Sequence, residues 1–75
     1  MDDLKAKAIA AIKDAISLSE HDDNPALEEA LGYLSTGALL SAACNCQHAQ
    51  QYAVEPAARE RRRLAFLACM EAWDG

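Results

Sequence analysis

A run of 25 residues from Ala30 to Val54 contains no formally charged side chain, although a quarter of all residues in the chain are charged. A surface helix keeps charged side chains on the face toward water, whereas a helix enclosed by other helices cannot place them on any side. The run therefore predicts a buried helical segment. In a chain of only 75 residues, such burial indicates a partner in addition to the chain's own helices.

Two prolines divide the chain, Pro25 after Asn24 and Pro56 after Glu55. Proline is tolerated at the first position of a helix because its missing N–H has no intrahelical partner there. We therefore expect helices at about residues 2–19, 25–52 and 56–73. Short polar connections favour antiparallel neighbours. The predicted fold is all-α, a small antiparallel bundle of three helices with a long central one, forming a single domain over residues 1–75 that dimerisation completes.

The central helix contains Gly32 and Gly37, each of which costs about 1 kcal/mol relative to alanine inside a helix. That cost favours a close approach of another helix at a surface of small residues, to which Ser35, Thr36 and Ser41 also belong. The alternative is that the helix breaks near residues 35–37, which gives four shorter helices.

Composition excludes several classes of protein. The net charge of −5 disfavours nucleic acids and anionic membrane surfaces as partners. The uncharged run carries too many serine, glutamine and asparagine side chains to cross a membrane unassisted. Three cysteines cannot form a fully paired disulfide framework, and the acidic start Met1-Asp2-Asp3 is unlike a signal peptide. We therefore expect a cytoplasmic protein with reduced thiols.

The segment Cys44-Asn45-Cys46-Gln47-His48 is the one cluster that combines cysteine and histidine, the residue types that bind soft metals. On a helix Cys44 and His48 lie one turn apart and could share a zinc ion, with Cys46, Cys69 or a second copy of the chain completing a tetrahedral site. We expect instead that the cysteines are small apolar core residues, and the metal site is the alternative. We expect no cofactor, with zinc as the alternative.

Arginines form a local basic patch in this acidic chain: Arg59, Arg61, Arg62 and Arg63. They spiral around the third predicted helix and do not make one flat face for a phosphate backbone. We expect them to be solvated and paired with Glu55, with Glu60 or with the acidic linker at residues 20–24. Pairing with Asp22 and Asp23, or with Glu28 and Glu29, of a second subunit is the alternative.

No catalytic motif appears, so the sequence favours a non-enzymatic protein–protein interaction module, a regulator, inhibitor or adaptor, that acts as a homodimer and binds an unidentified protein. Small and apolar positions of the central helix are the expected self-association surface: Leu31, Leu34, Ala38 and Ser41. Aromatic and methionine side chains on one face of the last helix are expected to contact the core or the partner: Phe66, Met70 and Trp73. The alternative function is metal binding or redox sensing through Cys44 and His48 with Cys46 or Cys69. The linker at residues 20–24 could also act as a hinge that exchanges the first helix between subunits.

From Pro25 onward, Ala26-Leu27 leads to Leu34, a centre of small residues follows, and Ala58-Arg59 and Arg63-Leu64-Ala65 open the last helix. This pattern resembles short bacterial helical-hairpin proteins of unknown function. The resemblance covers about two thirds of the chain and implies a small bacterial or phage-type protein. It carries over no functional residue.

Overall fold

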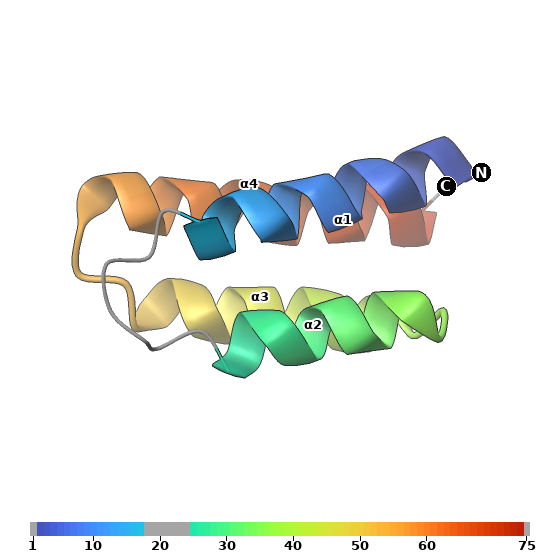
Figure 1. Ribbon diagram of the computed structural model, residues 1–75, viewed down its shortest axis with the longest axis horizontal. Helices are drawn as coiled ribbons and strands as arrows, with labels where there is room; N and C mark the ends of the chain where they lie inside the picture. Colours follow the sequence, from blue (N-terminus) through green and yellow to red (C-terminus); the bar gives the residue numbers. More distant parts are fainter. Residues whose placement is uncertain (1, 18–24, 75) are drawn as a thin grey trace.

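The computed structural model describes residues 2–17 and 25–74, and the regular elements in these ranges are all helices (Figure 1). The four helices are α1 (Asp2–Ser17), α2 (Pro25–Ser35), α3 (Leu39–Gln51) and α4 (Pro56–Asp74). The all-α prediction is confirmed, and α2 and α4 begin at the two prolines as expected. The linker proposed as a hinge, at residues 20–24, lies outside the described residues.

The helices run alternately up and down and pack in a square. Helix α1 contacts α2 and α4, and α3 contacts the same two helices from the other side. In Figure 1, α1 and α4 form one layer and α2 and α3 the other, so the start of α1 and the end of α4 lie at the same end of the bundle. The Cα positions extend over 32 × 17 × 17 Å. The described residues therefore form an antiparallel four-helix bundle.

The prediction of one long central helix is wrong, because the chain turns between α2 and α3. Gly37 has a φ of +86°, a conformation that L-residues with side chains rarely adopt. The N–H of Ala38 donates to the Tyr33 carbonyl over 2.8 Å, and the N–H of Gly37 donates to the Leu34 carbonyl over 3.1 Å. These two bonds define a Schellman motif, which satisfies the last carbonyls of α2 and reverses the chain. The alternative of four shorter helices is the one the structure adopts.

The glycines do not provide a surface of close helix contact within the chain. A Cβ added at Gly32 or Gly37 would meet no atom of the described residues within 4 Å. Gly37 is needed for its backbone conformation, and Gly32 lies on an exposed part of α2. The prediction that these residues mark a close helix–helix approach is therefore wrong for the single chain.

Small side chains dominate the core. The largest fully buried side chains are Ile12, Leu27, Leu34, Cys46 and Cys69. Alanines from all four helices supply most of the remaining core. Helix α3 buries only one face, and its outward face carries exposed residues that are polar but uncharged, such as Gln47 and His48. The uncharged run is therefore not enclosed on all sides by its own chain.

Polar contacts fix how neighbouring helices meet. The Asn45 side chain of α3 donates to the Ala26 carbonyl of α2 over 3.2 Å and to a Glu29 carboxylate oxygen over 3.1 Å. Arg59 donates to the carbonyl of Ala53, in the turn between α3 and α4, over 2.9 Å. None of the four helices, over the residues described, has both the length and the apolar character that a membrane crossing requires.

Candidate interaction surfaces

The four residues expected to form a self-association surface do not lie together. Leu34 is completely buried in the core of its own chain, so its placement on an exposed surface is wrong. Leu31 is half-buried on α2, and Ala38 is half-buried in the turn before α3. Ser41 is exposed on α3. The structure therefore divides this set between the core and separate parts of the surface.

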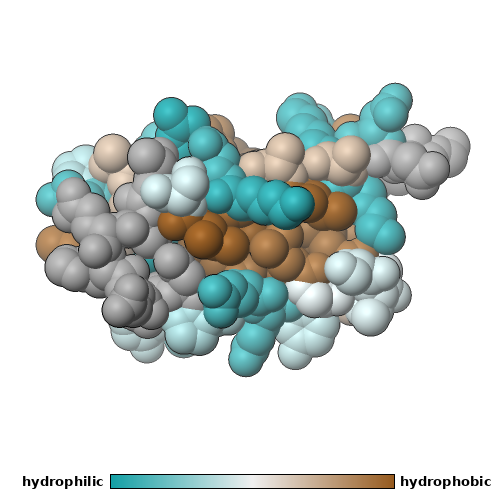
Figure 2. All heavy atoms as spheres, in the orientation of Figure 1, coloured by the Kyte–Doolittle hydropathy of each residue, from teal (hydrophilic) through white to brown (hydrophobic). Residues whose placement is uncertain are grey.

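Leu31 belongs to an apolar band between α1 and α2. The face drawn in Figure 2 shows hydrophobic side chains running between these two helices, with hydrophilic ones along both edges. On α1, the half-buried Ile9 and Ile16 lie opposite Lys7 and Asp14, whose ion pairs mark the side that faces α4. We call Ile9, Ile16 and Leu31 the α1–α2 band.

Leu31 joins this band because of its position around α2. Asn45 of α3 contacts Ala26 and Glu29, which marks the side of α2 that faces α3. At 100° per residue, Leu31 lies on the other side of the helix, toward α1. The band is shallow, because all three of its side chains are partly buried.

A second apolar surface lies between α1 and α4, in a groove of about 330 Å³. The residues that line this α1–α4 groove are Lys7, Ala11, Leu64, Leu67, Ala68 and Glu71. Leu64 is 42% exposed and Leu67 is 45% exposed. These two leucines lie in the middle of the longest helix, where an uncovered leucine side chain leaves apolar area in contact with water.

Two ion pairs between α1 and α4 bracket the groove. Lys7 Nζ lies 3.0 Å from Glu71 Oε1, and Arg61 Nη1 lies 2.7 Å from Asp14 Oδ2. The four side chains are between 48% and 64% exposed, so each pair adds little to stability. They define the register of the two helices, since Lys7 of α1 lies beside Glu71 of α4 and Asp14 lies beside Arg61. Each helix presents one positive and one negative charge at the ends of the groove.

The aromatic and methionine residues of α4 lie on its other side, away from Glu71. Phe66 and Met70 are half-buried and pack against the core, whereas Trp73 is 52% exposed near the end of the helix. The same end of the bundle carries Leu40, a further exposed apolar side chain at the start of α3. Of the three residues predicted to contact the core or a partner, Phe66 and Met70 therefore pack on the core and Trp73 lies at the surface.

The cysteines and His48 do not assemble into a metal site. Cys44 and His48 are exposed on α3, where the His48 ring lies edge-on to Tyr52 with centroids 4.9 Å apart. Cys46 and Cys69 are buried in the core. Within residues 2–17 and 25–74, no group of three or more histidine, cysteine or acidic side chains could hold a metal ion. Within one chain, the structure therefore does not bring Cys44 and His48 together with Cys46 or Cys69.

Cys46 and Cys69 instead form a pair between α3 and α4. Their side chains share a hydrogen bond, which raises the pKa of the Cys46 thiol above its ordinary value; burial raises it further. The same hydrogen bond lowers the pKa of Cys69. We call these two residues the thiol pair. Their burial in the core agrees with the expectation that the cysteines are small apolar core residues, whereas the exposed Cys44 departs from it.

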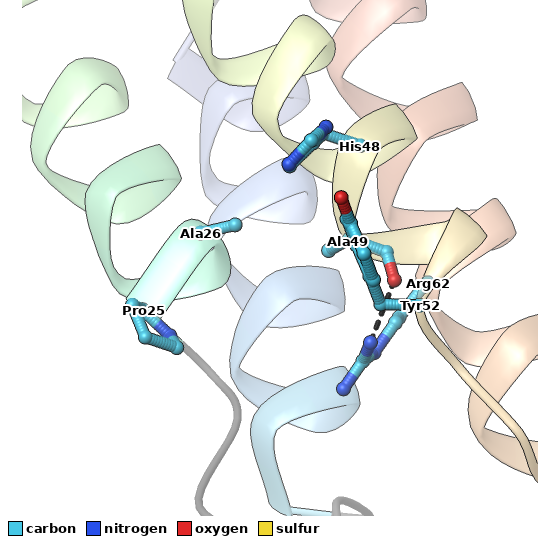
Figure 3. A pocket seen from close by; sticks show the side chains of 6 residues that line it. All are labelled: Pro25, Ala26, His48, Ala49, Tyr52 and Arg62. Atoms are coloured by element: carbon cyan, nitrogen blue, oxygen red, sulfur yellow. Dashed lines mark hydrogen bonds between the residues drawn. The ribbon is translucent and has the colours of Figure 1, made fainter.

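Arg62 differs from the prediction for the arginines, because its side chain is buried rather than solvated. The sequence predicts a solvated side chain, yet Arg62 is only 5% exposed, and its Nη1 donates to the Ala49 carbonyl over 2.6 Å (Figure 3). That carbonyl lies in the last turn of α3, where the helix dipole is negative and a cation is stabilising. A signal was present in the sequence, since Arg62 continues the stripe of Ala58, Ala65 and Cys69 on α4.

Arg62 also lines a pocket of about 260 Å³ between the start of α2 and the end of α3. The pocket walls are formed by Pro25, Ala26, His48, Ala49, Tyr52 and Arg62 (Figure 3). Of the other arginines, Arg63 pairs with Glu60 as expected, over 2.8 Å. The proximity of Arg63 lowers the pKa of Glu60 through a direct hydrogen bond. Pairing of the arginines with the linker lies outside the described residues.

The fold and these surfaces define a class, a small antiparallel four-helix bundle with an alanine-rich core and an apolar groove between α1 and α4. Comparison of the chain with protein-family models, with curated proteins and with solved structures finds no significant match.

Proposed function

We propose that the protein is a small, non-enzymatic protein–protein interaction module that acts as a homodimer and binds a further protein as a regulator, inhibitor or adaptor. The observation that carries this proposal is the set of large apolar side chains left uncovered on the helices, above all Leu64 and Leu67 in the middle of α4. A chain of this size buries a modest share of its surface by itself. Apolar side chains grouped in a groove are typical of an interaction site.

The chemistry of the larger hollows supports binding rather than catalysis. Apolar side chains dominate the α1–α4 groove, and amides line a second hollow of about 460 Å³ formed by Gln47, Gln50, Gln51 and Arg59. Such surfaces suit contact with another protein, whose side chains can pack on the leucines and bond to the amides. Free thiols, two of them buried, fit a reducing compartment such as the cytoplasm.

The test is the molar mass of the purified, reduced protein in solution, measured by sedimentation or light scattering across a concentration range. We expect about 16 kDa at the higher concentrations, twice the 8.1 kDa of one chain. The dimer should be unchanged by a chelator. A mass of one chain at every concentration would contradict the homodimer, and a dimer that dissociates with chelator would favour the metal-binding alternative instead.

A further inference from the structure

We infer that the α1–α4 groove is the site at which a second copy of this chain docks, with a two-fold axis parallel to the helices, so that α4 of each copy lies on α1 of the other. This inference rests on the proposed homodimer and specifies where its interface lies. Three observations support it: the shapes of the two helices, their charges and the size of the face.

The two helices differ in shape at the same level of the bundle. The ion pairs place Lys7 beside Glu71 and Asp14 beside Arg61. The middle of residues 7–14 on α1 therefore lies beside the middle of α4 along the bundle axis. At that level α1 presents alanines, with Ala10 exposed and Ala11 half-buried, while α4 presents the two projecting leucines. An axis parallel to the helices keeps every residue at its level and sets the leucines of one copy over the alanines of the other. Large side chains then fill hollows left by small ones, as close packing requires.

The charges at the ends of the groove are self-complementary. In this arrangement Lys7 of one copy lies next to Glu71 of the second, and Arg61 lies next to Asp14 of the second. Each ion pair of the single chain becomes a ring of four alternating charges, in which opposite charges fix the register. A two-fold axis perpendicular to the helices also pairs opposite charges. It stacks leucines on leucines and alanines on alanines, however, and leaves a gap between the two α1 helices.

The size of the face agrees with a reversible dimer. A side of the bundle measures 32 Å by 17 Å between Cα positions, or about 540 Å² per copy. Two such faces bury roughly 1,100 Å², which is near the lower limit for specific interfaces. We therefore expect a dimer whose mass falls toward that of one chain on dilution. The α1–α2 band is the weaker candidate, because all three of its side chains are partly buried.

The first experiment places a charge in the groove. Leu67→Glu should weaken the dimer about tenfold or more, since central apolar residues carry most interface energy. The matched control is Val54→Glu, which introduces the same charge at a position 86% exposed in the turn between α3 and α4 and should leave the dimer unchanged. Circular dichroism of both variants checks that the helices are retained. A folded Leu67→Glu variant that dimerises like the wild type overturns the inference.

The second experiment tests the orientation by charge reversal. Lys7→Glu and Glu71→Lys should each dimerise more weakly than the wild type, because each places like charges together at one end of the groove. Mixed in equal amounts, they should form a heterodimer, since the glutamate introduced at position 7 of one chain then faces the lysine introduced at position 71 of the other. Two weakened variants whose mixture stays monomeric would overturn the parallel axis, because the perpendicular axis brings each new side chain beside a like charge in the mixture as well.

These outcomes separate the inference from the proposed function. A wild-type chain that is monomeric at all concentrations contradicts both. A wild-type dimer that resists Leu67→Glu but dissociates with Leu31→Glu moves the interface to the α1–α2 band. In that case the homodimer stands and the assignment of the groove is wrong.

Discussion

Replacing Gly37 with alanine tests the turn that divides the predicted central helix into α2 and α3. Gly37 has a φ of +86°, and a Cβ added there meets no atom of the described residues within 4 Å. The cost of Gly37→Ala is therefore conformational rather than steric. A left-handed backbone conformation costs an L-residue with a side chain roughly 1–2 kcal/mol relative to glycine. We expect the free energy of unfolding to fall by about that amount.

Gly32→Ala provides the matched control, because the substitution is the same and the surroundings are equally open. Gly32 lies inside α2 with an ordinary helical backbone, so alanine there should raise the free energy of unfolding by about 0.5–1 kcal/mol. Urea denaturation followed by circular dichroism at 222 nm measures both changes. For a chain of this size, a change of 1 kcal/mol shifts the melting temperature by roughly 4–8 °C.

The sign of the Gly37 effect distinguishes the two folds. If α2 and α3 were one continuous helix, Gly37 would have a helical φ and alanine would stabilise the protein there as well. Opposite signs at the two glycines are expected for the four-helix bundle. Stabilisation at both positions would refute the Schellman turn and, with it, the packing of α3 against α2.

Three further outcomes test the polar and thiol contacts. Arg62→Leu should lower the free energy of unfolding by about 1.5–3 kcal/mol, because the charged hydrogen-bond donor to the last turn of α3 is lost. Urea denaturation measures this change. A decrease of less than about 0.5 kcal/mol would contradict the contact between Arg62 and Ala49. The lowered pKa of Glu60 means that its pairing with Arg63 contributes at neutral pH and is lost as the pH falls through the pKa of the folded protein. An NMR titration should show that Arg63→Gln returns this pKa toward its ordinary value, whereas an unchanged pKa would exclude the pairing. In the folded protein, an aromatic disulfide reagent should label Cys44 at once and the thiol pair only on unfolding; rapid labelling of all three cysteines would contradict the burial of the pair.

The helices themselves could be predicted from local signals. Helices α2 and α4 begin at Pro25 and Pro56, where proline is tolerated because its missing N–H has no partner. On α1, Ala8 and Ile12 are spaced one helical turn apart, which places them on one face, and both are fully buried. These features depend on residues within one or two turns of each other, so the order of the amino acids is sufficient to determine them.

From the sequence, the break at Gly37 is only an alternative to one continuous central helix. A glycine inside an uncharged run is compatible with a continuous helix and with a turn, and neither propensity nor spacing chooses between them. The choice follows from packing. Two short antiparallel helices can both place apolar residues such as Leu34 and Cys46 in one core, whereas a continuous helix would carry half of them away from the other two helices.

The residues of the candidate site likewise depend partly on the sequence and partly on the tertiary structure. The sequence by itself determined which residue types were available: leucines on α4, alanines on α1, three cysteines and a cluster of arginines. Only the tertiary structure decided that Leu64 and Leu67 are exposed beside α1, that Arg62 is buried, and that Cys46 meets Cys69 across 23 positions of sequence. The physical reason is that exposure and contact are set by which faces of separate helices meet. That pairing depends on the whole bundle, and a local pattern specifies only the face that each helix buries.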